Sequence, residues 1–380
     1  MEFRWPFNKL KSNHWVGINL SALAPSAVIY SDDGVIEAVA YDQEQGLDAL
    51  ELWIKKHVSH GMPTVLVLAD EDYELLLVEA PEVPDEELTA AIEFKIGDLL
   101  TQPIAETAIQ AIRLPKDAYR GRMSMAHVIA SKNETIKSRV EWAKELHLSV
   151  EVITVPEISL LNVLAASSVN QGIALLKLGP KHGTIRLYQE GALYLTRKIE
   201  VGIEALDLQY EEAPTQSAVD TAINTEDTDI TRNEINLEEM IANDDMNPEL
   251  MLTDEVDISE LEHEENEQDL EINEPEYVGF APKAKVNEQQ VQRLVLEVQR
   301  SLDYYESQLG MGQITQLWLM SGNTDLTHLV EAIQPALTAE VEQPKIVEKL
   351  QSSNIKITNS IDEMNTTAMA LGGALAYVAR

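Results

Sequence analysis

The sequence predicts a two-lobed α/β fold in which each lobe opens with three strands. The chain has 380 residues, enough for two lobes with separate cores. A three-strand pattern occurs near the start of the chain and begins again at Gly172. Asn19 precedes Tyr30 by 11 residues, and Lys177 precedes Tyr188 by 11 residues. The matched spacing indicates a repeat with the same topology in both lobes. The alternative is a chance likeness between two hairpins.

Residues 13–83 are predicted to form the core of the first lobe. Short apolar runs typical of buried strands are separated by turn residues, and one segment carries apolar side chains at helical spacing. The predicted strands cover residues 15–20, 27–30, 35–41, 64–69 and 74–80, and the predicted helix covers residues 47–58.

The next segment, 84–150, opens with a helix. Pro84 is followed by three acidic residues, which suit the positive end of a helix dipole. The apolar side chains of this helix share one face, and they are Leu88, Ile92, Ile96 and Leu99. A further helix is predicted near 136–146. Residues 151–171 then return to the first lobe through a strand at 150–155 and a helix that begins at Pro156.

The second lobe is predicted to start with residues 172–209 and to resume at 286–380. Apolar residues recur at helical spacing over 291–309 and predict a long amphipathic helix, and Gly310 suits its C-terminal end. The last predicted helix contains Gly372 and Gly373, where another backbone can pack closely. The remaining predicted elements are strands at 173–178, 184–188, 192–201 and 314–320 and helices from 325 and over 366–378.

Negative charge is concentrated in the interval 210–285, which interrupts the second lobe. The chain carries a net charge of -37, and between Tyr210 and Tyr277 there are 24 acidic residues against one basic residue, Arg232. A segment of this composition cannot bury enough apolar surface to offset its ordering entropy, so we expect a disordered insertion. It could dock a basic surface or serve as a spacer. The strong acidity also argues against nucleic-acid binding.

Residues 1–12 form a leader that mixes three aromatic with three basic side chains. Such a mixture can contact an anionic membrane surface, and the simpler interpretation is a disordered leader with a few packed aromatics. No apolar run reaches the roughly 18 residues that a membrane span needs, and no signal-peptide stretch is evident. The absence of cysteine fits a reducing compartment.

Several segments in order carry a resemblance to a known family. They are Pro84–Leu88, Ile92–Lys95, Leu99–Ile104, Glu297–Tyr305 and Leu319–Gly322. Together they resemble PilM-type pilus assembly proteins, and among these the members that serve mannose-sensitive haemagglutinin (MSHA) pili. The resemblance implies a two-lobed actin/hexokinase-like fold with duplicated βββαβα units, in which 84–150 is an inserted subdomain.

The resemblance also implies a function. PilM-type proteins lie at the cytoplasmic side of the inner membrane, are peripheral to it, and grip the cytoplasmic tail of a bitopic PilN-like partner. Coupling to the assembly motor ATPase is implied as well. The groove would lie between the first-lobe core and residues 84–150, with Ile92, Phe94 and Ile96 as candidate contacts; the alternative is that these residues are plain core. A secretion-platform protein of the GspL kind shares the fold, but such proteins continue into a transmembrane helix.

The nucleotide chemistry that the actin-like fold implies looks degenerate. Carboxylates are expected where the first strand of each lobe ends, since they hold Mg²⁺ between the phosphates. In this chain Asn19 stands at the first-lobe position, with Ser21 two residues later. Lys177 stands at the second-lobe position, with Gly179 two residues later. The adenosine-side turn, Ser321, Gly322 and Asn323, is better kept. We therefore predict no ATP hydrolysis, no metal site and no catalytic residue. ATP binding without turnover stays open, and the alternative is a working ATPase that controls assembly.

Overall fold

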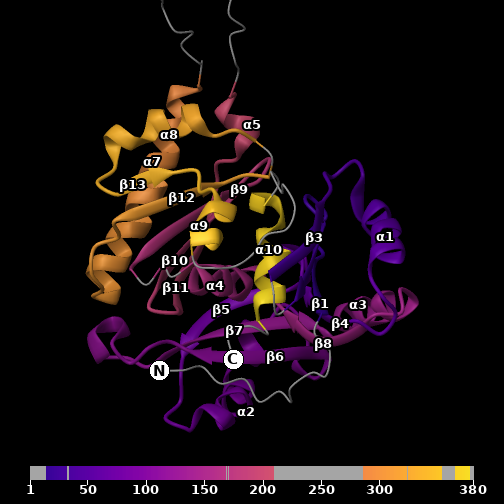
Figure 1. Cartoon of the computed structure of the whole chain (residues 1–380). Coiled ribbons are helices and arrows are strands. Elements are labelled where there is room, and N and C mark those ends of the chain that lie inside the picture. The colour runs from indigo at the N-terminus through magenta and orange to yellow at the C-terminus, as the bar shows by residue number, and fades with distance from the viewer. Residues whose placement is uncertain are drawn as a thin grey trace, which may run out of the picture. The chain divides into compact units, whose positions relative to one another are not determined.

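A computed structural model describes residues 14–31, 34–167, 169, 171–208, 286–322, 324–352 and 364–376. Figure 1 shows the chain from its indigo N-terminal strands to its yellow C-terminal helix. The predicted leader, 1–12, and the predicted acidic insertion, 210–285, lie outside the described residues. Among the described residues, none of the helices has the length and apolar character needed to cross a membrane.

The first lobe is built on a five-stranded sheet in the order β3-β2-β1-β4-β8. β1, β2 and β3 form an antiparallel meander, whereas β4 pairs parallel to both β1 and β8. The helices α1 and α3 cover one face with a shared apolar core. The bounds are β1 His14–Asn19, β2 Ser26–Ser31, β3 Gly34–Ala40, α1 Gly46–His57, β4 Pro63–Val67, α3 Asn133–Glu145 and β8 Ser149–Thr154.

The second lobe repeats this order in the sheet β11-β10-β9-β12-β13. Its outer face is covered by α7 and α8, which share the largest apolar core. α7 begins where the Asn287 side chain accepts a hydrogen bond from the Gln290 N–H, an N-cap that satisfies one free backbone donor. The bounds are β9 Ile173–Leu178, β10 Gly183–Gln189, β11 Ala192–Ile199, α5 Ile203–Leu206, α7 Glu288–Tyr304, β12 Gln316–Met320, α8 Thr327–Ile333 and β13 Glu340–Glu342.

Strand register confirms the predicted repeat. Tyr30 lies opposite Trp15 in the first lobe, and Tyr188 lies opposite Ile173 in the second. Each of these partners lies four positions before Asn19 or Lys177, which stand at or next to the end of their strands. Asn19 and Lys177 therefore occupy equivalent positions in the two lobes, as their spacing to the tyrosines predicts.

Two helices, α4 (Pro156–Ala166) and α10 (Met364–Leu375), pack with both sheets in one apolar core. α10 lies against β1, β2 and α4, as Figure 1 shows. A Cβ at Gly372 would stand 1.9 Å from the Ser159 carbonyl oxygen, so only glycine fits this helix crossing. The close packing predicted at Gly372 is confirmed. α9 (Ile346–Ser352) also contacts α10.

A separate three-stranded sheet, β5-β7-β6, lies between β4 and α3 in the chain. Its strands pair antiparallel, and α2 covers one face. The bounds are β5 Glu74–Glu79, α2 Asp85–Ile96, β6 Thr107–Arg113 and β7 Met125–Lys132. The inserted sheet thus starts before residue 84 and ends at Lys132, while α3 and β8 belong to the first lobe. Our range, 84–150, differs at both ends because β5 pairs with β7 and β8 pairs with β4.

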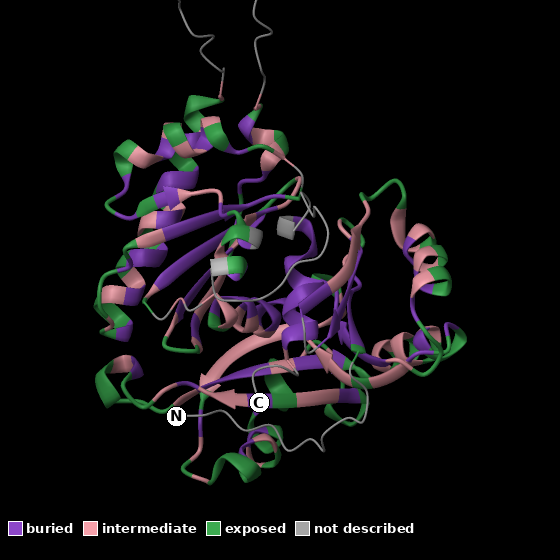
Figure 2. Cartoon of the chain, viewed as in Figure 1, coloured by how far each residue is buried: buried purple, intermediate pink, exposed green. Residues whose placement is uncertain are grey.

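Short helical turns connect these elements. The long helix predicted over 291–309 is α7 followed by a π-helical turn, and it ends at Gly310 with φ of 73°, as predicted from that glycine. Figure 2 shows buried residues along α10 and the second-lobe strands β9 and β12, intermediate residues along β5 and β8, and exposed residues on the outer faces of α1 and α2. The turns are η1 Asp70–Asp72, η2 Gly97–Leu99, η3 Ile104–Glu106, η4 Ala118–Gly121, η5 Tyr305–Leu309 and η6 Gln334–Ala336.

Candidate functional site

Asn19, at the end of β1, is buried and closes its own turn. Its Nδ2 donates to the Ala24 carbonyl oxygen at 2.8 Å and to Ser26 Oγ at 3.4 Å. Its Oδ1 accepts a hydrogen bond from the Ser21 N–H at 3.3 Å. The amide therefore stabilises the β1–β2 turn, and it supplies no charge to attract a divalent ion.

The second-lobe residues of the predicted cleft meet at one sheet edge. Met320 lies opposite Lys177 in the parallel pair β9–β12, so Ser321 and Gly322 follow β12 beside the end of β9. The Gly179 N–H donates to the His182 carbonyl oxygen at 2.9 Å, which closes the β9–β10 turn. The register thus places Lys177 and Gly179 beside Ser321 and Gly322 at one end of the sheet. Asn323 lies outside the described residues.

A side chain from the first lobe reaches the second-lobe turn. A Cβ built at Gly179 would lie 3.9 Å from Leu23 Cδ1, and Leu23 belongs to the β1–β2 turn. The two turns that would cradle phosphates in an actin-like nucleotide site therefore approach each other through an apolar side chain.

Beside Lys177 lies a buried ion pair that the sequence analysis did not identify. Arg186, on β10, is 1% exposed, and Glu157, in the first turn of α4, is 3% exposed. Arg186 donates to Glu157 Oε1 from Nε at 3.0 Å and from Nη2 at 2.8 Å. The Tyr73 hydroxyl donates to Glu157 Oε2 at 2.7 Å. Each carboxylate oxygen of Glu157 is therefore engaged, as a buried charge requires.

Asp70 links Lys177 to this pair. Its carboxylate oxygens lie 3.9 Å from Lys177 Nζ and 3.8 Å from Arg186 Nη2. The Asp70 side chain is 52% exposed, and that of Lys177 is 25% exposed. Two positive and two negative groups thus balance one another at this junction. Among the described residues, no group of three or more histidine or acidic side chains is placed to hold a metal ion.

Burial controls the protonation of this cluster. Desolvation lowers the pKa of Lys177, and the nearby Asp70 opposes that effect. Burial raises the pKa of the Tyr73 hydroxyl, and the Glu157 charge raises it further. Burial alone would lower the pKa of Arg186, but the Glu157 carboxylate outweighs it and holds that pKa above its usual value. Arg186 is therefore ionised, and Tyr73 remains a proton donor.

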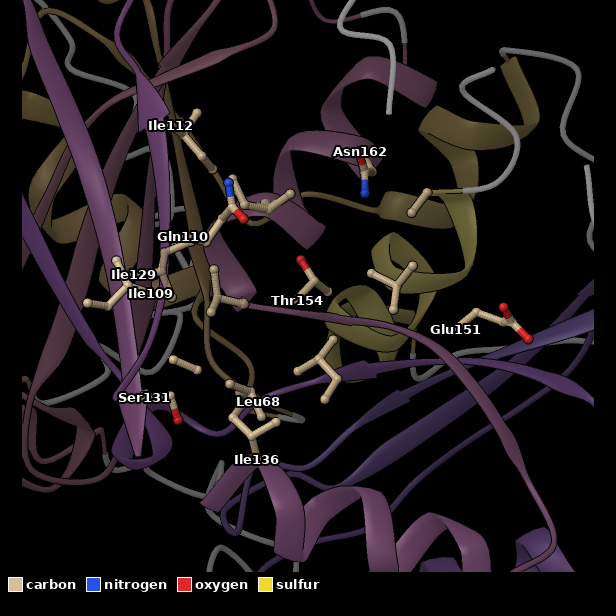
Figure 3. A pocket seen from close by; sticks show the side chains of 16 residues that line it. Leu68, Ile109, Gln110, Ile112, Ile129, Ser131, Ile136, Glu151, Thr154 and Asn162 are labelled. Atoms are coloured by element: carbon tan, nitrogen blue, oxygen red, sulfur yellow. The ribbon is translucent and has the colours of Figure 1, made fainter. Parts of the chain in front are cut away.

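A second feature is an apolar groove of about 370 Å³ between the inserted sheet and the first lobe. One wall comes from β6 and β7, and the other comes from β8, α3 and α4. Figure 3 shows side chains from both walls converging, with Ile129 and Thr154 from opposite sides and Glu151 apart at one end. The lining includes Leu68, Ile109, Ile112, Ile129, Ile136, Val152, Ile153 and Ile158.

Both walls of the groove include a strand edge to which no further strand is paired among the residues that the structure describes. Five consecutive residues at and just after β8, 151–155, line the groove, and so do three consecutive residues of β6, 108–110. Successive strand side chains point to opposite faces, so a consecutive run indicates that the groove follows the strand edge. β6 and β8 are each the last strand of their sheets. The groove therefore offers backbone donors and acceptors together with apolar side chains.

The polar side chains in the lining are partly occupied by the fold. Asn162 Nδ2 donates to the Gly372 carbonyl oxygen at 2.9 Å, and Ser131 Oγ donates to the Asp72 carbonyl oxygen at 2.6 Å. Gln110 Nε2 donates to Thr89 Oγ1 at 3.3 Å. The groove is thus suited to an apolar ligand rather than to a charged one.

The three candidate contacts on α2 do not line this groove. Ile92 and Ile96 are buried between α2 and its sheet, whereas Phe94 is 92% exposed on the outer side of the helix. Ala126 and Val128 face α2, and Ile129, the residue after Val128, lines the groove, so the groove lies on the other face of β7. Ile92 and Ile96 therefore fit the alternative interpretation, in which they are ordinary core residues.

The groove was not predicted from the sequence, because β6 and β7 were not predicted as strands. Residues 125–131 form a mostly apolar run with β-branched members, which is a usable signal for a buried strand. Arg186 was also detectable, since it is the charged residue inside an otherwise apolar strand pattern at 184–188.

Comparisons with known proteins place the fold. No protein-family profile matches the chain, and no curated protein matches it. Among solved structures, a chain of the "PilM-PilN type IV pilus biogenesis complex" is 15% identical with a TM-score of 0.59, over 96% of this chain and 98% of that chain. This likeness, with the repeated sheet order, confirms the predicted two-lobed actin-like fold.

Two weaker structural matches accompany it. The cytoplasmic domain of EpsL, an inner-membrane component of the type II secretion system of Vibrio cholerae, is 14% identical with a TM-score of 0.37, over 49% of this chain and 71% of that chain. A Bacteroides thetaiotaomicron protein with an actin-like ATPase fold is 12% identical with a TM-score of 0.32, over 50% of this chain and 71% of that chain.

Proposed function

We propose that this chain is a PilM-like scaffold of a type IV pilus assembly machine. In this proposal it holds the cytoplasmic tail of a PilN-like inner-membrane protein in the groove between β6 and β8. The observation that carries the proposal is the groove itself, an apolar trough with an open strand edge on each wall. The likeness to a chain of the PilM–PilN complex over nearly the whole length supports it.

The groove chemistry specifies the kind of ligand. An extended peptide can pair with the free backbone of β8 or β6, in the manner of strand addition, while its side chains fill the apolar lining. A globular ligand would not fit a trough of about 370 Å³. A partner tail with alternating apolar residues is therefore the expected occupant.

The cellular setting follows from the same proposal. The scaffold would sit in the cytoplasm and reach the inner membrane through its partner. The assembly motor ATPase is a further proposed partner. The motif order of residues 84–104 and 297–322 supports an MSHA-type (MshI-like) member of the class.

We further propose that the chain does not hydrolyse ATP. Asn19 closes its own turn, and Lys177 stands at the equivalent second-lobe position beside Asp70. A metal-bound triphosphate would meet a positive side chain where a carboxylate normally holds the ion's waters, so Mg²⁺ catalysis of phosphoryl transfer lacks its support. The alternative is an ATP-binding protein whose nucleotide state controls assembly, favoured by the retained turns at Gly179 and Ser321.

Isothermal titration with a synthetic peptide of the PilN-like tail tests the proposed function. We expect micromolar binding that weakens by at least about tenfold, or roughly 1.4 kcal/mol, in the groove variant Ile112→Asp. The matched control is Phe94→Asp, because Phe94 is exposed on the inserted subdomain but lies outside the groove. Absence of binding to the unaltered chain at high micromolar peptide would reject the proposal.

A further inference from the structure

The buried charge cluster joins the second lobe to both walls of the groove. Arg186 and Lys177 come from β10 and β9 of the second lobe, whereas Asp70, Tyr73 and Glu157 come from the first-lobe side. We call these five residues the interlobe clasp. The Arg186–Glu157 contacts, at 2.8–3.0 Å, are hydrogen-bonded as well as ionic, which fixes direction as well as distance.

The clasp residues stand next to groove residues in the chain. Glu157 lies between Val155 and Ile158, and both of these line the groove. Asp70 follows Leu68, another lining residue, by two positions. A shift in the clasp therefore moves the start of α4 and the end of β4 by short, stiff connections.

A second connection reaches the opposite wall. The Asp72 carbonyl oxygen accepts a hydrogen bond from Ser131 Oγ on β7, and the Asp72 carboxylate pairs with Arg139 at 2.8 Å. Ser131 lines the groove from the inserted sheet. The turn η1, which supplies Asp70 to the clasp, is thus fastened to both walls.

We propose that the interlobe clasp sets the spacing of the groove walls, so that the second lobe controls how tightly the groove holds its ligand. The clasp residues are positioning residues, because they do not line the groove. The ligand's identity rests on the proposed function, but the mechanical coupling does not.

Hydrogen exchange of the unliganded chain tests the coupling. The double variant Glu157→Gln with Arg186→Met removes both charges, so no unpaired ion stays buried. We expect amides of segments 68–73 and 151–158 to exchange roughly 5–150-fold faster, the range typical of coupled sites. Amides of β1 serve as an internal reference and should keep their rate. The matched control is Glu297→Gln with Arg197→Met, an ion pair at 2.7 Å within the second lobe.

The outcomes separate the coupling from general stability. Unchanged exchange in the groove segments would overturn the proposal, and so would an equal acceleration of β1, which indicates a merely structural pair. If circular dichroism shows the double variant to be unfolded, Tyr73→Phe removes one hydrogen bond to Glu157 and is judged by the same two criteria.

A peptide titration adds the link to binding. With the PilN-like tail peptide, the clasp variant should bind more weakly by a similar factor while the control binds as the unaltered chain does. Equal affinity in the clasp variant and the unaltered chain would overturn the control of affinity. If the unaltered chain binds no peptide, the proposed function fails, and the exchange data alone still decide the mechanical coupling.

Discussion

Single residues decide which chemistry this fold can carry. Asn19 and Lys177 occupy equivalent positions in the two lobes, yet they do different work. The amide closes a turn within the first lobe, and the ammonium group pairs with Asp70 across to the first-lobe side. Neither position carries the carboxylate that holds an ion's waters in the nucleotide site we expected from the resemblance.

His127 makes a pH-dependent contribution to stability. It is buried on β7, and desolvation lowers its pKa to about 4, below its usual 6.5. As the pH falls, this histidine takes up its proton at a higher pH in the unfolded chain than in the folded chain. The free energy of unfolding therefore decreases as the pH drops from 6.5 toward 4, and His127 does not affect it above that window. At pH 5 the expected loss from this group is about 2 kcal/mol.

Urea unfolding at pH 7 and pH 5 measures this effect. Between pH 7 and pH 5, the free energy of unfolding should fall by about 2 kcal/mol less in His127→Leu than in the unaltered chain. His57→Gln is the control, since His57 is partly exposed and contacts Glu37. Identical pH dependence in the unaltered chain and His127→Leu would show that His127 does not carry the effect.

At the scale of elements, the crossing of α4 and α10 depends on glycine. Gly372→Ala would place a methyl group 1.9 Å from the Ser159 carbonyl oxygen, which forces the helices apart. We expect a loss of about 1–3 kcal/mol or more in the free energy of unfolding. Gly97→Ala is the matched control, because a Cβ there meets nothing within 4 Å. Equal stability of the two variants would show that the crossing is looser than described.

The strands and helices of both lobes could be predicted because their apolar periods agree with their positions in the sheets. The ends of β1 to β4 and β9 to β11 lie within two residues of the predicted ranges. The candidate site could not be predicted from the sequence, for two physical reasons. Alanines at 108 and 111 weaken the alternation of β6, and the partner of β5 is 46 or more residues away in β7. No local pattern shows which strand edges face each other.

The same limit applies to the interlobe clasp. Glu157 resembles any acidic residue at the start of a helix, where it suits the dipole. Its partner Arg186 is 29 residues away on another lobe, and only the folded chain brings the two together. Arg186 shows in the sequence as an isolated charge in an apolar strand, but nothing local identifies its partner.

At the scale of the whole molecule, we predict that the chain does not turn over ATP. Saturating Mg-ATP should release no phosphate. A shift in the midpoint of thermal unfolding would report nucleotide binding alone, because a ligand stabilises a protein only if it binds the folded state. An actin-fold ATPase measured in parallel is the control. Steady turnover of Mg-ATP that is abolished in Lys177→Ala would favour the alternative function.

The central claim is that the groove between β6 and β8 holds the tail of a PilN-like partner. The chain contains no cysteine, so a single introduced cysteine reports one position without background. Thr154→Cys places it in the groove, and Phe94→Cys places it on the exposed face of α2. We predict a disulfide cross-link between a cysteine-bearing tail peptide and Thr154→Cys, and none with Phe94→Cys. Cross-linking at Phe94→Cys, with none at Thr154→Cys, would contradict the account.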